Sequence, residues 1–196
     1  LAALKEQVAT EQARAESNAA LARTDQLTGL LDRRAILERL QALFALSERH
    51  GRPLTLAVVD LDHFKRVNDA AGHLAGDDVL RAVATVMVEL VRDSDVIGRW
   101  GGDELLVVLP ETDADAAAVT MDRVLDRVRD EVHVSGDGQP GGPAATAPIT
   151  LSVGIAERTP ADDQDGLLSR ADHALYRAKA SGRDQIVVDR GEHARV

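Results

Sequence analysis

The chain has 196 residues, which is enough for one domain with an appendage but not for two full domains. Hydrophobic residues make up 44% and charged residues 29%, a balance typical of a folded globular protein. The net charge of −10 and the 2% aromatic content argue against nucleic-acid binding, which needs a basic surface. The absence of cysteine excludes disulfides and thiolate zinc sites, and no apolar run approaches the roughly 20 residues that span a bilayer. We therefore expect no membrane contact by this segment.

Residues 1–24 predict a helix, because they are rich in Ala, Glu, Gln and Arg and contain neither Gly nor Pro. A heptad frame that starts at Leu1 places Leu4 and Val8 on one seam, but it also places Glu11 there. Two interpretations stay open: an isolated solvated helix, or the end of a dimeric coiled coil that leads into a catalytic domain. Because the chain begins with Leu, we expect it to be part of a longer protein.

Beyond this segment, helical and strand patterns alternate. Amphipathic periodicity predicts helices over residues 28–50, 77–92, 113–132 and 164–181. Short apolar runs predict strands over residues 54–60, 96–100, 105–109, 149–155 and 185–188, and a run rich in Gly and Pro predicts a loop over 135–148. One hairpin is antiparallel by its tight turn. The expected fold is therefore an α/β (α+β) sandwich with a mixed, largely antiparallel sheet flanked by helices.

Two aspartates stand at the end of the first predicted strand. Asp60 closes the apolar run 54–60 and Asp62 follows two residues later, so both carboxylates can face the same side of the sheet. Acids at the end of a buried strand serve as helix caps or as metal ligands. Asp62 can be the N-cap of a short helix over residues 63–68, an interpretation that leaves Asp60 unexplained.

A glycine-rich acidic turn, Gly101-Gly102-Asp103-Glu104, separates the next two strands, and by itself it fits a plain hairpin. The presence of two acidic clusters on short strands of one sheet favours a functional interpretation over a plain hairpin. Carboxylates about 4 Å apart repel by about 4 kcal/mol at an effective dielectric near 20, so a protein that gathers them needs a cation. Oxygen ligands without Cys or clustered His favour Mg²⁺ or Mn²⁺ over zinc. Carboxylates that hold Mg²⁺ beside a nucleoside triphosphate are typical of phosphoryl transfer.

Several motifs occur in an order that resembles one known family. They are DQLTGL at 25–30 with Arg33 and Arg34, VDLDHFK at 59–65 with Asn68 and Asp69, Gly72-His73, Gly76-Asp77, RWGGDELLVVLP at 99–110, SVGIA at 152–156, and ADHALYRAKASGR at 171–183. Together they resemble the diguanylate cyclase (GGDEF) family over residues 25–188. A lone GGDE is a weak signal, whereas this ordered set is specific.

The resemblance implies both a fold and a reaction. Members are similar to the palm of nucleotidyl cyclases and polymerases, and they condense two GTP into cyclic di-GMP with release of two pyrophosphates. Each subunit holds one GTP, so the resemblance implies a homodimer with facing sites, with Mg²⁺ (or Mn²⁺) as cofactor. It also implies a cytoplasmic bacterial protein with an upstream sensory domain, a signalling helix over 1–24, a cyclase domain over 25–190 and a tail over 191–196.

The resemblance also implies a role for each residue of the metal and catalytic site. The implied metal ligands are the carboxylates of Asp60, Asp103 and Glu104 and the backbone carbonyl of Leu61. Glu104 is either a further acid at the metal or the base that helps a ribose 3′-OH attack the α-phosphate of the other GTP. Asp103, Glu104 and Lys179 are the implied catalytic residues, although Lys179 taken alone reads equally well as an ordinary solvated helix lysine.

The implied substrate contacts divide between base and phosphates. Asn68 and Asp77 would read the guanine edge, since an Asp accepts hydrogen bonds that adenine does not offer. The remaining contacts would be to phosphates, from the backbone N–H groups of Phe64 and Lys65, the Lys65 ammonium, Lys179 and Arg183.

Two further positions bear on regulation and on the signature itself. Arg92 and Asp95 stand where the family has an inhibitory site for its product, although an R-x-x-D also fits a helix-end arginine paired with a nearby aspartate. Leu105 stands where the family name has Phe, and we expect it to point into the core, so that the change is one of packing.

Three functions are compatible with this sequence. The leading hypothesis is an active cyclase, because the acids and bases that the reaction needs are all present. The second is a catalytically silent domain that senses GTP or cyclic di-GMP, and the third is a dimerisation scaffold. Silent domains have usually lost a signature acid, whereas this chain keeps Asp60, Asp103 and Glu104.

Overall fold

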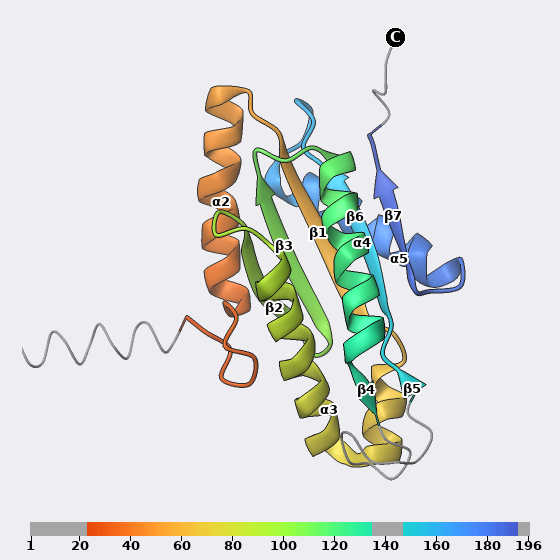
Figure 1. Ribbon diagram of the computed structural model, residues 1–196. Coiled ribbons are helices and arrows are strands. Elements are labelled where there is room, and N and C mark those ends of the chain that lie inside the picture. Colours follow the sequence, from red (N-terminus) through yellow and green to blue (C-terminus); the bar gives the residue numbers. More distant parts are fainter. Residues whose placement is uncertain (1–22, 135–146, 192–196) are drawn as a thin grey trace, which may run out of the picture.

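The computed structural model describes residues 23–134 and 147–191 and contains a five-stranded mixed sheet (Figure 1). Its order is β2-β3-β1-β6-β7, in which β6 and β7 are parallel and the other neighbours are antiparallel. The strands are β1 (Leu54–Leu61), β2 (Val96–Gly101), β3 (Glu104–Pro110), β6 (Leu151–Glu157) and β7 (Gln185–Asp189). The predicted mixed, largely antiparallel α+β architecture is therefore confirmed.

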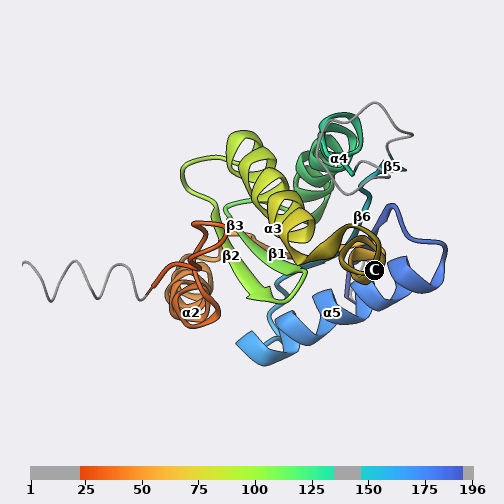
Figure 2. The ribbon, with the colours of Figure 1, turned by 90° about the horizontal axis from the view of Figure 1, so that it is seen from below.

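Two pairs of helices sandwich the sheet (Figure 2). Its two faces carry α3 (Phe64–Leu90) with α4 (Ala114–Glu131), and α2 (Arg33–His50) with α5 (Gln164–Ala180). The central strand β1 is buried along its whole length. Because its side chains alternate, Ala57 and Val59 pack in the cluster that includes α3 and α4, while Leu56 and Val58 pack in the cluster that includes α2 and α5. An even-numbered residue such as Asp60 therefore faces the α5 side.

The helix expected over residues 28–50 begins later, at Arg33. Asp32 caps it by accepting a hydrogen bond from the N–H of Ala35 at 2.7 Å. Upstream, the Asp25 carboxylate accepts hydrogen bonds from both the N–H and the hydroxyl of Thr28. This local turn competes with helix formation, which is why periodicity alone extended the helix too far.

Helix α3 is longer than the sequence predicts. The sequence predicts a helix over 77–92 and allows a short one over 63–68, whereas α3 runs from Phe64 to Leu90 with a break at Gly72, where φ is +83° and ψ is 164°. The glycine permits this left-handed step, and it folds the first turns of α3 back toward the rest of the helix. Both parts of α3 thereby border one end of the sheet.

A short strand replaces the end of the predicted loop over 135–148. β4 (His133–Val134) pairs antiparallel with β5 (Ala147–Pro148), so that residues 147 and 148 are not loop. The rest of that predicted loop, residues 135–146, lies outside the described residues, as do most of the expected helix over 1–24 and most of the tail over 191–196. Of that N-terminal helix, residues 23 and 24 are described and are not helical, since Thr24 forms a β-bridge with Leu31.

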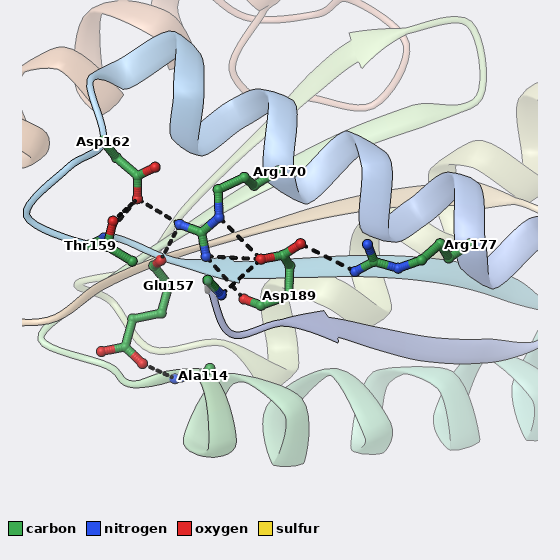
Figure 3. A network of polar contacts seen from close by, with 8 residues as sticks. Ala114, Glu157, Thr159, Asp162, Arg170, Arg177 and Asp189 are labelled. Atoms are coloured by element: carbon green, nitrogen blue, oxygen red, sulfur yellow. Dashed lines mark hydrogen bonds and ion pairs between the residues drawn. The ribbon is translucent and has the colours of Figure 1, made fainter. Parts of the chain in front are cut away.

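A charged network fastens the last strand to α5 (Figure 3). The Arg170 guanidinium donates to Asp162 at 2.6 Å, to the Glu157 carbonyl at 2.9 Å and to the Asp189 carboxylate at 3.1 Å. Arg177 reaches the other oxygen of Asp189 at 3.3 Å. The side chains of Arg170 and Asp162 are only 19% and 9% exposed, so these bonds are shielded from solvent and fix the register of β7 against α5.

None of the described helices has both the length and the apolar character that a membrane-spanning segment requires.

Candidate active site

Two acidic side chains face each other across the neighbouring strands β1 and β3. Asp60 stands directly opposite Glu104 in the antiparallel register. Beside them, the Leu61 N–H donates to the carbonyl of Asp103 at 3.2 Å, which joins the β2–β3 turn to the end of β1. Like charges opposite each other destabilise a sheet, so this pairing is costly to the fold. The structure thus places the four residues that the resemblance implies as metal ligands on the adjoining ends of β1 and β3.

Asp60 also contacts a cation. Lys179 of α5 places its Nζ 2.7 Å from Oδ2 of Asp60, and the Asp60 side chain is only 10% exposed. The pKa of Asp60 is raised from 3.8 to about 6, because burial and the charges of Asp103 and Glu104 raise it by more than the contact with Lys179 lowers it. The single ammonium group therefore does not offset both the burial and the acidic neighbours of this carboxylate.

The donor chemistry of this cluster suits a hard divalent cation. Carboxylate oxygens and a backbone carbonyl are the ligands that Mg²⁺ prefers. Within residues 23–134 and 147–191, however, no three Asp, Glu or His side chains are already arranged so that they could hold an ion. Lys179 takes up one oxygen of Asp60, so a metal bound at that oxygen would displace the lysine. The assignment of Asp60, Leu61, Asp103 and Glu104 as ligands stays a prediction.

The glycine-rich turn is braced from outside the acidic cluster. Arg99 donates to the carbonyl of Gly102 from Nη2 at 2.8 Å and from Nε at 3.1 Å, and its Nη1 lies 3.1 Å from both carboxylate oxygens of Asp25. Burial raises the pKa of Asp25, but hydrogen bonds from Thr28 and Arg99 bring it below its ordinary value. Arg99 and Asp25 were not predicted as site residues, although each begins one of the quoted motifs.

The start of α3 has the geometry of an anion site. His63 occupies the cap position with φ +57° and makes no side-chain cap bond, so the alternative in which Asp62 is the N-cap is wrong. Phe64 and Lys65 are the first two helical residues, and the earliest N–H groups of a helix lack partners within the helix. Together with the helix dipole they favour a negatively charged ligand, as the predicted phosphate contacts require.

A glycine allows the two predicted guanine-reading residues to lie close together. A Cβ atom added to Gly76 would lie 1.9 Å from Oδ1 of Asn68 and 3.1 Å from Cζ of Phe64. Asn68 therefore packs directly against the backbone of Gly76, the residue that precedes Asp77. The break at Gly72 makes this contact possible, because it folds the first part of α3 back onto the second.

Two cations extend from the end of α5 toward the two aspartates at the end of β1. Lys179 contacts Asp60, and Arg183 has its Nε 4.0 Å from Oδ1 of Asp62, with 42% of the arginine side chain exposed. The predicted phosphate-binding cations thus stand at the same end of the sheet as the acids. Asp62 itself is fully buried and does not join Asp60 in the acidic cluster.

The predicted inhibitory pair lies at the opposite end of β2 from the glycine-rich turn. Asp95 precedes β2, and its carboxylate accepts a hydrogen bond from the backbone N–H of Arg92 at 2.9 Å. The strand has six residues, so at about 3.3 Å per residue the two places are about 20 Å apart. The Arg92 side chain is exposed, and both residues line a shallow groove with Val88 and Ile97.

Leu105, the departure from the family signature, is 1% exposed and belongs to the core on the α3 and α4 side. The expectation that it points into the core is confirmed. Beside the turn, Trp100 is half-buried, and the Arg33 guanidinium stacks over its ring at 4.4 Å from the centroid. Neither Leu105 nor Trp100 belongs to the acidic cluster.

Comparison with known proteins shows which family this chain resembles. Residues 22–185 match a family model described as "Diguanylate cyclase, GGDEF domain". The chain is 42% identical over 165 residues to the diguanylate cyclase DgcP of Pseudomonas aeruginosa, covering 84% of this chain and 24% of that protein. Among solved structures, the coiled coil and GGDEF domain of DgcB from Caulobacter crescentus, in complex with c-di-GMP, superimposes with a TM-score of 0.89 at 31% identity and 96% coverage of both chains. SiaD of P. aeruginosa, in complex with its activator SiaC, gives a TM-score of 0.77 at 38% identity, covering 95% of this chain and 70% of that one.

Proposed function

The chain belongs to the diguanylate cyclase GGDEF-domain family, and we propose that it condenses two GTP into cyclic di-GMP with release of two pyrophosphates. The chain spans about a quarter of the length of the first curated relative, so the activity is inferred here for the domain. The observation that carries the proposal is the cross-strand pair Asp60 and Glu104. A sheet that places like charges opposite each other tolerates that cost where a bound cation offsets the repulsion.

The residues divide the proposed reaction between them. Asp60, Asp103, Glu104 and the Leu61 carbonyl would hold Mg²⁺. When bound, this ion would neutralise charge on the triphosphate and act there as a Lewis acid. Glu104 would accept the proton of the ribose 3′-OH of the facing GTP. The freed oxygen forms a bond to the α-phosphorus, and the bond from that phosphorus to the pyrophosphate oxygen breaks. Lys179 would stabilise the charge that develops on the leaving pyrophosphate.

The beginning of α3 and the end of α5 would bind the nucleotide. The backbone N–H groups of Phe64 and Lys65 would hold phosphate oxygens, joined by the cation of Arg183. Asn68 and Asp77 lie close together through Gly76 and would read the guanine edge, which favours GTP over ATP. We infer from the proposed GTP site that the protein is cytoplasmic, because the cytoplasm is where nucleoside triphosphates are found.

One subunit provides half of this reaction. Each site binds one GTP, and the 3′-OH that attacks comes from the GTP of another subunit, so we infer a homodimer with facing sites. The SiaD complex with its activator supports the idea that such domains also respond to protein partners. For this chain we infer control by an upstream sensory domain through residues 1–24.

Incubation of the purified protein with GTP and Mg²⁺ tests the function. We expect cyclic di-GMP, identified by mass spectrometry, with no product from ATP. The rate per subunit should rise with protein concentration until the chain is dimeric, since the monomer lacks the second GTP. Bound GTP without any turnover at high protein concentration would instead indicate a nucleotide sensor. A rate that is independent of concentration while the chain stays monomeric would contradict the facing-site dimer.

We further propose that cyclic di-GMP inhibits the enzyme at Arg92 and Asp95, about 20 Å from the catalytic turn. The Arg92 guanidinium is suited to clamp a phosphate and stack on guanine. We expect Arg92→Ala to weaken cyclic di-GMP binding at least about tenfold in isothermal titration, while the initial rate without product is unchanged. Arg49→Ala, which removes an exposed arginine at the end of α2, is the matched control. Unchanged tight binding in Arg92→Ala would refute this assignment.

A further inference from the structure

The turn between α5 and β7 has an unusual backbone. Gly182, Arg183 and Asp184 have φ values of +117°, +65° and +48°, so that two non-glycine residues in succession adopt the left-handed conformation. L-residues avoid this region because the Cβ atom crowds the backbone. Such a conformation persists only where the surrounding structure enforces it, and it is found disproportionately at functional sites.

Asp62 holds this turn from inside the fold. Its side chain is completely buried. Oδ2 accepts hydrogen bonds from the Asp184 N–H at 3.0 Å and the Thr150 hydroxyl at 2.8 Å, and Oδ1 accepts one from the Ser152 hydroxyl at 2.6 Å. Both oxygens are therefore already engaged with protein donors, which makes Asp62 a poor metal ligand and a strong anchor for the turn.

A second contact to the turn comes from α4, but it is weaker. Arg129 lies 2.8 Å from Oδ1 of Asp184, and both side chains are more than a third exposed. Exposed ion pairs contribute little, whereas a hydrogen bond from a backbone N–H to a buried carboxylate is charge-assisted and shielded from water. The Arg183 N–H also donates to the Ala178 carbonyl at the end of α5 at 3.0 Å, which closes the turn onto the helix. Of the two side chains that hold Asp184, Asp62 is therefore the buried and stronger one.

We propose that Asp62 is a positioning residue, which holds the turn at 182–184 so that Arg183 is presented to the nucleotide polyphosphate beside Lys179. This inference rests on the proposed GTP site. The geometry supports it because Asp62 stands two residues after Asp60: one strand end carries both the carboxylate that faces Lys179 and the anchor of the Arg183 turn. The three consecutive residues from Asp60 to Asp62 thus set the distance between the acidic cluster and the two cations, Lys179 and Arg183.

Nucleotide binding tests the proposal without turnover. Calorimetry would compare the α,β-methylene analogue of GTP, which cannot release pyrophosphate, with GMP, in the presence of Mg²⁺. In Asp62→Ala we expect affinity for the triphosphate analogue to fall at least about tenfold, toward that of Arg183→Ala, while affinity for GMP changes less than about twofold. If Asp62→Ala does not fold, Asp62→Ser gives the same test, because its short hydroxyl cannot reach the Asp184 N–H. Asp62→Asn, which keeps an acceptor oxygen for that N–H, should recover most of the affinity.

Two comparisons separate positioning from a general loss of structure. Ser152→Ala removes one donor to Asp62 but leaves the Asp184 bond, so it should keep the preference for the triphosphate. The double variant Asp62→Ser with Arg183→Ala should bind the analogue no more weakly than Arg183→Ala alone. An unchanged preference in the Asp62 variants, an equal loss for both nucleotides, or additive losses would each overturn the positioning role. A wild-type protein that binds neither nucleotide would overturn the proposed function itself.

Discussion

Replacement of Glu104 by glutamine should abolish cyclic di-GMP formation, with a fall in turnover of about 100-fold or more. The amide has the shape of the carboxylate but can neither accept the 3′-OH proton nor contribute charge to a metal ion, and general-base catalysis alone is worth about 10²–10⁴. The fold should not suffer, because Glu104 stands opposite Asp60 and the change removes a like-charge cross-strand pair. The measurement is the initial rate with GTP and Mg²⁺, with the free energy of unfolding measured alongside it.

Glu48→Gln is the matched control for this prediction. It makes the same chemical change at an exposed position near the end of α2, outside the acidic cluster, and it should leave the rate unchanged. Full activity in Glu104→Gln would show that the carboxylate is not needed for catalysis. GTP binding with no product in the wild-type protein would favour the sensor over the enzyme.

The second large effect is a gain in stability that accompanies a loss of function. In the presence of a chelator at pH 8, we expect Asp60→Asn to unfold less readily than the wild-type protein, by up to about 3 kcal/mol. Burial together with the charges of Asp103 and Glu104 raises the pKa of Asp60 to about 6, so ionised Asp60 disfavours the folded state despite its contact with Lys179. The same variant should lose cyclase activity, because it lacks a predicted metal ligand.

The sign follows from the direction of the pKa change. The unfolded chain releases the Asp60 proton near pH 3.8, whereas the folded protein holds it to about pH 6. Between these values the folded state binds more protons, so the Asp60 contribution to stability falls as pH rises and is constant above about pH 6. Wild type and Asp60→Asn should therefore differ little at pH 4 and most above pH 6. Chemical denaturation at a series of pH values measures this difference.

Two controls accompany this pH series. Asp122→Asn changes the same charge at an exposed position of α4 and should show no such pH-dependent gain. Addition of Mg²⁺ should raise the melting temperature of the wild-type protein by mass action and leave that of Asp60→Asn nearly unchanged. An Asp60→Asn protein that is less stable than wild type at pH 8 would contradict the proposed electrostatic cost.

Local sequence signals located most of the elements of the fold. The apolar run of β1 and the amphipathic faces of α4 and α5 are local patterns, so they located these elements to within a few residues. Local competition explains the errors. The Asp25 side chain diverts the chain before α2, and the break at Gly72 joins two predicted helices into α3. Both effects need hydrogen bonds or φ values that hydrophobicity does not encode.

The sequence by itself determined that the chain forms a mixed α+β sandwich and that acids gather on β1 and at the β2–β3 turn. Only the tertiary structure decided which of them work together. Asp60 and Asp62 are equivalent in the sequence pattern, yet the register of β3 places Glu104 opposite Asp60, whereas β6 and the turn after α5 surround Asp62 with donors. The same is true of Arg99, which reaches Asp25 across 74 positions of the chain. Strand order, register and helix docking are long-range choices made by burial of the whole core, so no local pattern could have assigned these partners.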